Sequence, residues 1–377
     1  MSEKHLHIIS PDVPFPANYG TAIDIYHQLE AFHALGISIH LHCFDYGRGN
    51  QLKLQEYCAS VHYYTRTMGH KAFSAKMPYI VSSRMNETLF QNLLKDAYPI
   101  LMEGIHCTYL LNDPRFEGRK LLVRLHNIGH LFYEDMFRNT SSLFKKAYAW
   151  HEARLLKKYE EKIASKVLFA GLNSADINLY QQKMACKGIS EVPAFIPSWE
   201  VRGEEGMGSY CLYHADLSTE TNEKTAIWLL KNVFSQLNLP LVITGRNPSE
   251  KLVHLSHQSK FSCLVANPSE KEMKDMITKA HIHILPSFSS TGCNLQLLHA
   301  LFIGRHCILN ESAVKNNELE SACHIGSNAN AFRELILQLY YQPFTKEEIT
   351  LRKKLLGHQF NNNENARKLL RLLDLAN

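Results

Sequence analysis

Apolar residues recur with two different periods at the start of the chain. Residues 5–10, HLHIIS, form a mostly apolar run that predicts a strand. A helical period begins at Gly20 and ends before Gly36, a natural C-cap. Its apolar positions are Ala22, Ile25, Tyr26, Leu29 and Phe32. Residues 37–44, ISIHLHCF, then alternate between apolar and polar side chains, which is the period of a strand. Together these segments predict a βαβ unit.

The same order of strands and helices returns in the second half of the chain. The predicted strands are 210–216, 239–245, 281–287 and 306–310, and the predicted helices are 223–237, 270–280 and 294–302. Residues 191–208 contain prolines, glycines and acids without a periodic pattern, which indicates a linker. The expected domains are therefore residues 1–190 and 209–358, followed by a C-terminal helix at 359–377.

The composition is that of a folded protein with two domains. The chain has 377 residues, of which 45% are apolar and 20% charged. Because it has no stretch of 18 apolar residues and no signal-peptide layout, we expect it to stay in the cytoplasm. Its nine cysteines form no CxxC pair, which favours reduced, mostly buried thiols over disulfides or structural zinc.

Positive charge is concentrated in one segment. The net charge of +5 is too small to indicate nucleic-acid binding. Residues 143–166, however, contain seven bases and three acids, a local charge of +4. This segment is either a solvated helix face with i,i+4 ion pairs or a surface for anionic lipid or a phosphorylated acceptor. A peripheral contact with the inner face of the membrane is therefore one interpretation.

Two doubly wound α/β domains would place the carboxyl ends of their sheets face to face across a cleft, where ligands bind. The segment 285–305, LPSFSSTGCNLQLLHALFIGR, is one of the turns that follow strands. Its helix start is a ready site for phosphate, although no charged residue lies between Pro286 and Gly304. The loop at 10–21 lacks the GxGxxG fingerprint, which argues against a nicotinamide dehydrogenase, and Gly20 would let a ligand approach the backbone.

Polar residues at other strand ends are further candidates. His126 and Asn127 follow an apolar strand, where His126 is either a partner for a substrate hydroxyl group or a satisfied core residue. Glu103 also follows an apolar strand, so it either faces the cleft or meets a base. Three HxH pairs could each seat a metal, but no carboxylate cluster accompanies them. We therefore expect no metal site and no cofactor.

The succession of motifs resembles the GT-B glycosyltransferases, and within them the retaining group called family 4 or "group 1", over nearly the whole chain. The N-terminal half contributes SPDVPFPANYGTAIDIYHQLEAFHALG, EGIHC, RLHNIGHLFYEDM and FAGLNSADINLY. The C-terminal half contributes YHADLSTETNEKTAIWLL, VITGRNPS and ILPSFSSTGCNLQLLHALFIGR in the order typical of that group. Such motifs occur in transferases of bacterial surface polysaccharide synthesis.

The resemblance implies transfer of a sugar from a nucleotide diphosphate sugar to a glycan or lipid-linked acceptor, with the anomeric configuration kept. His126 would meet the transferred sugar, and Glu103 and Asn127 would bind sugar or acceptor. Residues that would bind the donor are Gly20, Arg246, Ser290, Thr291, Gly292, Cys293 and His299. The nucleotide sugar would be a substrate, so the resemblance implies no cofactor and no metal.

The chain departs from the family at its two hallmark glutamates. An alignment on ALFIGR places Thr291 and His299 at these positions. The basic pair that clamps the diphosphate is also replaced, and Arg246 and Arg305 are the nearest bases. Three hypotheses stay open at this stage: an active transferase with a divergent donor site, an inactive binding or scaffolding protein of a glycan-assembly complex, and an epimerase or phosphorylase on the same fold.

Overall fold

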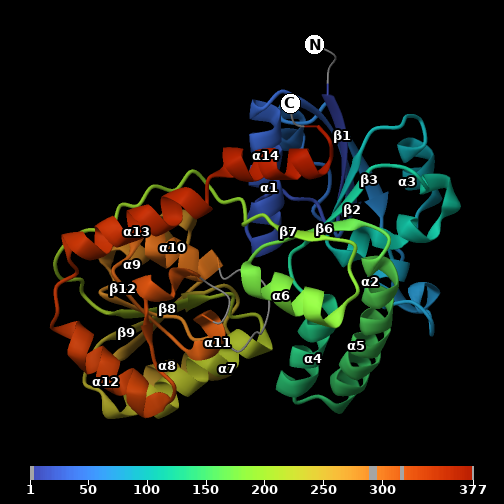
Figure 1. Ribbon diagram of the computed structural model, residues 1–377. Helices are drawn as coiled ribbons and strands as arrows, with labels where there is room; N and C mark the ends of the chain where they lie inside the picture. Colours follow the sequence, from blue (N-terminus) through green and yellow to red (C-terminus); the bar gives the residue numbers. More distant parts are fainter. Residues whose placement is uncertain (1–3, 288–294, 315–317, 376–377) are drawn as a thin grey trace. The chain divides into compact units, whose positions relative to one another are not determined.

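The computed structural model of the protein describes residues 4–287, 295–314 and 318–375. This part of the chain forms two compact units (Figure 1). The first unit comprises residues 4–197 and 360–375, and the second comprises the described residues from 198 to 359. The first unit therefore ends at Pro197 rather than at residue 190, and the C-terminal helix belongs to it.

The first unit contains a parallel sheet whose described strands number seven, in the order β3-β2-β1-β4-β5-β6-β7. The strands are β1 Lys4–Ser10, β2 Ile37–Asp45, β3 Ser60–Thr65, β4 Ile100–Glu103, β5 Leu121–Leu125, β6 Leu168–Gly171 and β7 Ile189–Glu191. The helices are α1 Gly20–Ala34, α2 Tyr79–Ser82, α3 Glu87–Leu93, α4 Gly129–Asn139, α5 Leu143–Ala164, α6 Ser174–Lys183 and α14 Asn362–Leu372. The predicted βαβ unit is confirmed, and Gly36 has the left-handed φ of 76° that its predicted role after the helix requires.

Successive side chains of β1 and β2 point to opposite faces of this sheet, and each face has its own core. Leu6 and Ile8 of β1 pack into one core together with Leu369 of α14, and Figure 1 shows α14 beside α1. Ile9 belongs to the core of the opposite face, which also contains side chains of α5. Because successive side chains of a strand point to opposite faces, the predicted alternation accounts for both cores.

The second unit contains a parallel sheet whose described strands number six, in the order β10-β9-β8-β11-β12-β13. The strands are β8 Cys211–Ala215, β9 Leu241–Gly245, β10 Ser262–Ala266, β11 Ile282–Ile284, β12 His306–Leu309 and β13 His324–Ile325. The helices are α7 Glu220–Trp228, α8 Glu250–Gln258, α9 Glu270–Lys279, α10 Leu295–Ile303, α11 Glu311–Val314, α12 Ala329–Tyr340 and α13 Lys346–Gln359. The helix predicted over 223–237 is α-helical only to Trp228 and continues as a π turn, Leu229–Val233, and a 3-10 turn, Phe234–Gln236.

Helix α10 explains the uncharged segment found in the sequence. Its side chains Leu297, Leu298 and Leu301 are all fully buried, as are Ala300 and Phe302. A helix that is apolar around most of its circumference is a core helix, so charged side chains there would be costly to bury. Packing in the core thus explains why the described part of this segment, helix α10, has no charged residue.

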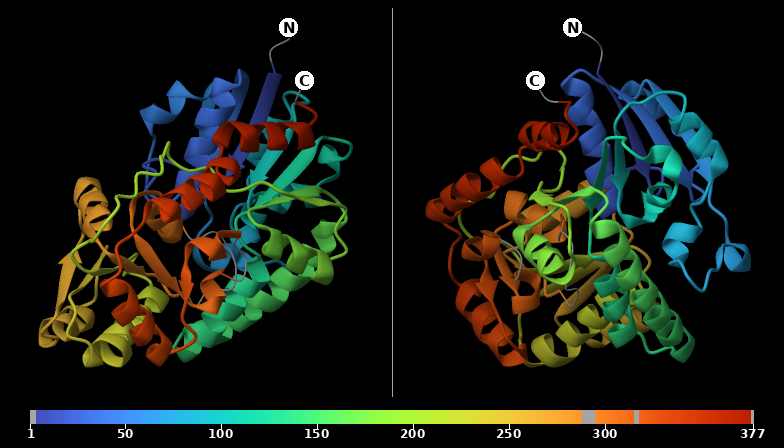
Figure 2. Two further views of the ribbon diagram at one scale, coloured as in Figure 1. Left: turned by 60° about the vertical axis from the view of Figure 1, so that its left-hand side comes forward. Right: turned by 45° about the vertical axis from the view of Figure 1, so that its right-hand side comes forward.

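Helices α4 and α5 form an antiparallel pair in the first unit. Figures 1 and 2 show the two helices side by side, and they make extensive contacts. Ser142 caps α5 by accepting a hydrogen bond from the backbone N–H of Lys145. None of the described helices is both long enough and apolar enough to cross a bilayer.

Candidate active site

A cavity of about 320 Å³ lies in the first unit, where the loops after β1, β4 and β5 meet. Its lining residues are Pro11, Asp12, Tyr19, Thr21, Tyr46, Arg84, Gly104, His106, His126 and Asn127. Because these strands are parallel, their carboxyl ends share one edge of the sheet, which is where doubly wound folds bind ligands. Of the segments that the sequence predicts to bind ligands, the loop at 10–21 and the strand ends at Glu103 and His126 are therefore brought together here.

His126 is held between two buried carboxylates. Its Nε2 lies 2.7 Å from Oε2 of Glu103, and its Nδ1 lies 3.1 Å from Oδ2 of Asp24. An ionised carboxylate only accepts hydrogen bonds, so each ring nitrogen donates and the ring is an imidazolium. Burial by itself would lower the pKa of His126, but the hydrogen bonds and charges of Asp24 and Glu103 outweigh it and raise the pKa to about 9.

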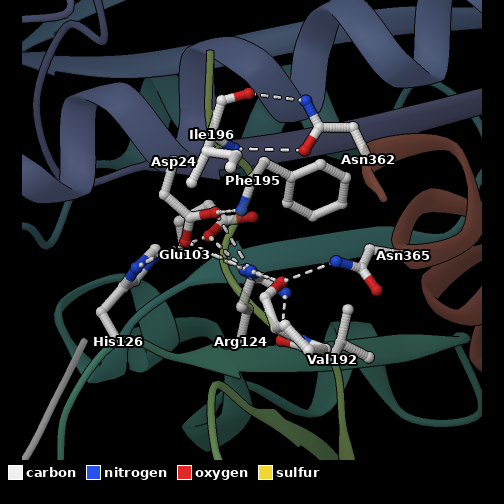
Figure 3. A network of polar contacts seen from close by, with 10 residues as sticks. Asp24, Glu103, Arg124, His126, Val192, Phe195, Ile196, Asn362 and Asn365 are labelled. Atoms are coloured by element: carbon white, nitrogen blue, oxygen red, sulfur yellow. Dashed lines mark hydrogen bonds and ion pairs between the residues drawn. The ribbon is translucent and has the colours of Figure 1, made fainter. Parts of the chain in front are cut away.

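Arg124 completes this buried network. Its guanidinium donates to both carboxylate oxygens of Asp24, at distances of 3.1 to 3.3 Å. Burial would raise the pKa of Asp24, yet Arg124, followed by His126 and the backbone N–H of Phe195, lowers it to about 2. Glu103, which is fully buried, lies 4.0 Å from Nε of Arg124. Two carboxylates and two cations therefore balance one another. Figure 3 shows the contacts among these four side chains.

The chain segment that follows β7 closes this network from one side (Figure 3). Arg124 donates hydrogen bonds to the carbonyl oxygens of Val192 and Pro193 and stacks over the ring of Phe195. Asn362 of α14 exchanges two hydrogen bonds with the backbone of Ile196. Residues 192–196 fall in the stretch predicted to be a linker, but they are part of the first domain because Arg124 and α14 hold them there.

The loop after β1 supplies polar groups of the cavity. Oδ2 of Asp12 accepts a hydrogen bond from the hydroxyl group of Tyr19 and lies 3.3 Å from Nε of Arg48. Arg84 donates to the carbonyl oxygens of Pro11 and Ile80, so its charge lies beside the cavity without a carboxylate bonded to it among the described residues. The cavity thus has both acidic and basic groups in its wall.

Gly104 allows the backbone to pass close to two histidines of the cavity. Its φ of 82° lies in the left-handed region, and a Cβ atom added there would be 3.0 Å from Nδ1 of His106. Both observations favour glycine at this position. A larger side chain at residue 104 would therefore press against the ring of His106 and reach the ring of His126.

No protein family model matches this sequence. A relative from Klebsiella pneumoniae, described as an uncharacterized 44.6 kDa protein in the cps region, is 24% identical over 317 residues, which are 78% of this chain and 79% of that protein. The sucrose-phosphate synthase of Thermosynechococcus elongatus is similar in structure, with a TM-score of 0.71 and 13% identity over 98% of each chain. An α,α-trehalose-phosphate synthase (UDP-forming) of Burkholderia xenovorans has a TM-score of 0.63 and 11% identity over 98% of this chain and 100% of that one.

The chain has the GT-B fold. The fold class predicted from the sequence, with two Rossmann-like doubly wound domains, is confirmed. In GT-B terms the cavity belongs to the N-terminal domain. Of the residues predicted for sugar or acceptor, His126 and Asn127 line this cavity, and Glu103 lies behind it in contact with His126. Gly20 begins α1 and is exposed, next to the cavity residues Tyr19 and Thr21.

The C-terminal domain of the GT-B fold contains two more of the predicted donor residues, Arg246 and His299. Arg246 forms an ion pair of 3.1 Å with Asp216, and both side chains remain partly exposed. The ring of His299 stacks on Trp199 with a centroid distance of 4.6 Å. Burial, assisted by the charge of Lys274, lowers the pKa of His299 to about 4, so this ring is neutral at neutral pH. Ser290, Thr291, Gly292 and Cys293 lie outside the described residues.

Sequence reasoning missed Asp24, Asp12, Arg84 and His106 as members of the site. Asp24 had a usable signal, because it is an acid among the apolar residues Ile23 and Ile25 of a helix that packs on the sheet. A buried carboxylate requires a partner, and Arg124 at a nearby strand end supplies one. Arg84 and His106 gave no comparable signal, because only the fold brings them beside the loop after β1.

Proposed function

We propose that the protein transfers a sugar from a nucleoside diphosphate sugar to a hydroxyl group of a glycan or lipid-linked acceptor, with retention, in cell-surface polysaccharide synthesis. The observation that carries this proposal is the polar cavity at the carboxyl edge of the first sheet in a chain with the GT-B fold. The names of the two similar enzymes, which are sugar-phosphate synthases, support the reaction class. The location of the relative in the cps region supports a role in cell-surface polysaccharide synthesis.

His126 contributes to such a reaction through position and charge. With a pKa of about 9 and both ring nitrogens bonded to carboxylates, it is a poor general base at neutral pH. A hydrogen bond from His126 to a sugar would require one of these two contacts to open. The ring therefore forms a rigid, cationic part of the wall against which the transferred sugar is oriented.

The other cavity groups suit a polyhydroxylated acceptor. Asp12 offers carboxylate oxygens to hydroxyl groups, and Arg84 and Asn127 offer N–H donors. A volume of about 320 Å³ lies at the lower end of the usual range for small-molecule sites. We assign the acceptor or the transferred sugar to this cavity. For the departing diphosphate we propose contacts with Arg246 of the C-terminal domain and with residues 290–293, which lie outside the described part of the chain.

His299 favours a second candidate, an inactive GT-B protein that binds or scaffolds. At the position where the resemblance implies a glutamate, the chain has a neutral ring stacked on Trp199. A neutral stacked ring does not replace a carboxylate that accepts hydrogen bonds from a ribose or sugar. This candidate predicts that the protein copurifies with another transferase and does not bind nucleotides.

A thermal-shift panel with UDP, GDP, dTDP, ADP and CMP separates the two candidates. A ligand that binds only the folded form at 100 times its Kd stabilises it by about 2.7 kcal/mol. For domains of this size that corresponds to a rise in Tm of roughly 5–10 °C. We expect such a rise with one nucleoside diphosphate, which also identifies the base of the donor. An unchanged Tm with all five would reject the transferase proposal in favour of the binding protein.

We also propose that α5 contacts the surface of an anionic membrane, where a lipid-linked acceptor would reside. Leu143 and Phe144 at its start are 80% and 91% exposed, and Trp150 is exposed one to two turns later. Lys145 and Lys146 lie beside them in sequence, and Arg154 stacks on Trp150. Exposed apolar side chains next to bases are the combination that binds anionic lipid headgroups and the acyl boundary.

Vesicle cosedimentation tests this surface. We expect the protein to bind phosphatidylglycerol-containing vesicles more tightly than phosphatidylcholine vesicles, and we expect Leu143→Ser with Phe144→Ser to weaken binding at least about tenfold. The matched control is Leu52→Ser, because Leu52 is an equally exposed leucine outside α5. Equal binding by the α5 variant and the control would reject the membrane contact without affecting the nucleotide result.

A further inference from the structure

Three side chains that are distant in the sequence converge in the second unit. His306 is the first residue of β12, His324 is the first residue of β13, and Glu348 lies in the first turn of α13. One nitrogen of each ring and one oxygen of the carboxylate all lie within 4.8 Å of one another. In the parallel pairing His324 is opposite Ile308, so His306 and His324 point to the same face of the sheet.

The hydrogen bond of Nε2 of His306 determines whether Nδ1 of the same ring carries a hydrogen or a lone pair. Nε2 lies 3.1 Å from the carbonyl oxygen of Gln342, which only accepts, so Nε2 carries the hydrogen. In that tautomer Nδ1 presents a lone pair. Nδ1 is buried, has no hydrogen-bond partner among the described residues, and lies 3.3 Å from Oε1 of Glu348. A lone pair and a carboxylate oxygen at this distance repel each other unless a cation joins them.

Glu348 is held by hydrogen bonds that leave one of its carboxylate oxygens available to a cation. Its Oε2 accepts a hydrogen bond of 2.8 Å from the backbone N–H of Thr345, and its own N–H donates to Oγ1 of Thr345. These two bonds form the capping box of α13 and fix the carboxylate. Oε1 therefore faces Nδ1 of His306 because the helix cap orients the group, with Oε2 committed to the backbone.

The ring of His306 is equally well fixed. Phe344 and His281 contact it edge-on, with centroid distances of 5.2 and 5.1 Å. A histidine that binds a metal commonly donates its other N–H to a backbone carbonyl, which is the arrangement at Gln342. Two ligands that are each 2.0–2.1 Å from a tetrahedral ion are separated by roughly 3.3 Å, the separation of Nδ1 and Oε1.

We propose that His306, His324 and Glu348 form a site for a divalent transition-metal ion, with Zn²⁺ as the preferred ion. Two imidazole nitrogens and one carboxylate oxygen are typical zinc ligands, and His324 and Glu348 are accessible enough for water to complete a tetrahedral shell. The ion ties α13 to the β12–β13 edge of the sheet. His306 begins its strand, whereas the transfer residues follow the carboxyl ends of strands, so this site serves the structure of the second unit.

Metal titration of the full-length protein after chelation tests the proposal. We expect one equivalent of Zn²⁺ to compete with a chromophoric chelator, and one equivalent of Co²⁺ to give the visible absorption of a tetrahedral N/O site. We expect His324→Ala to abolish both signals. We expect Glu348→Gln to weaken Zn²⁺ binding more than about tenfold while α13 keeps its cap, because glutamine also completes a capping box. Circular dichroism of the metal-free variants checks that they fold.

The control removes a surface pair of histidines. His254 and His257 lie three residues apart on α8, so they are the kind of pair that binds zinc adventitiously. The double variant His254→Ala, His257→Ala should bind one equivalent as the wild type does. Absence of stoichiometric binding by the wild type, or unchanged binding by folded His324→Ala, would overturn the proposal. In the first case His306 and Glu348 would share a proton instead.

Discussion

The buried network around His126 shows how single residues define the site. Asp24 and Glu103 provide two negative charges, and Arg124 and His126 provide two positive charges. Each ion is paired, so removal of any one leaves a charge buried without compensation, which typically costs 3–5 kcal/mol. The sequence indicated that Glu103 either faces a cleft or meets a base, and the structure shows the base. The sequence marks Asp24 as an acid between two apolar residues of a helix, but it does not indicate that Asp24 contacts His126, because this contact arises only through the packing of α1.

The pKa of His126 makes stability depend on pH in a defined window. In the unfolded chain the pKa is 6.5, and in the folded protein it is about 9, so the folded state binds the proton more tightly. This contribution is complete below pH 6.5 and is lost as the pH rises toward 9, with a magnitude of roughly 3 kcal/mol. Urea unfolding of the wild type and of His126→Gln between pH 6 and 9.5 measures it. We expect the difference between them to shrink as the pH rises; a constant difference would show that the imidazole is not held as a cation.

For the helices and strands, the spacing of apolar residues along the chain predicted where most of them lie. It did not predict which elements pack against one another. The strand patterns at 5–10, 37–44 and 306–310 predicted β1, β2 and β12 to within about two residues. The C-terminal helix was predicted as a separate segment, because its sequence does not indicate which of the two sheets it packs against. In the structure Leu369 of α14 is fully buried in the core beneath α1.

Substitutions in α14 test its contribution to the first domain. We expect Leu369→Ala to destabilise the first domain by about 2–5 kcal/mol, because a fully buried leucine leaves a cavity when truncated. Arg367→Ala on the exposed side of the same helix should change stability by less than about 0.5 kcal/mol. Denaturant unfolding followed by a probe in residues 4–197 measures both. A Leu369→Ala loss no larger than that of Arg367→Ala would mean that α14 does not stabilise this domain.

At the scale of the whole molecule, the chain keeps an unusual number of histidines neutral and buried. The sequence contains 21 histidines, and six of them form the three HxH pairs. In the structure His7 and His42 hydrogen-bond each other across β1 and β2, and His283 of β11 is fully buried. The composition revealed the histidines but not their protonation, which depends on burial. The donor contacts predicted for residues 290–293 stay a prediction, because these residues lie outside the described part of the chain.

These histidines predict loss of stability in acid in both units. Burial lowers the pKa of His7 to about 4 in the first unit and that of His214 to about 3 in the second. Since the unfolded chain binds these protons at pH 6.5, stability falls as the pH drops from 6.5 toward 4. We expect Tm to decrease over this range and His7→Gln to reduce the decrease, as measured by calorimetry. A flat Tm between pH 6.5 and 4.5 would contradict the neutral, buried assignment.

Turnover of a nucleotide sugar shows whether the chain transfers sugar. The measurement is release of nucleoside diphosphate from the donor whose base the thermal-shift panel identifies, with a lipid or glycan acceptor fraction present. We expect release by the wild type, unchanged release by the surface variant His254→Gln, and a loss of at least about 100-fold in folded His126→Gln, because the ring positions the reacting sugar. If the folded wild type released no diphosphate from any donor, the chain would not be a sugar transferase; if His126→Gln released it at the wild-type rate, His126 would not position the reacting sugar.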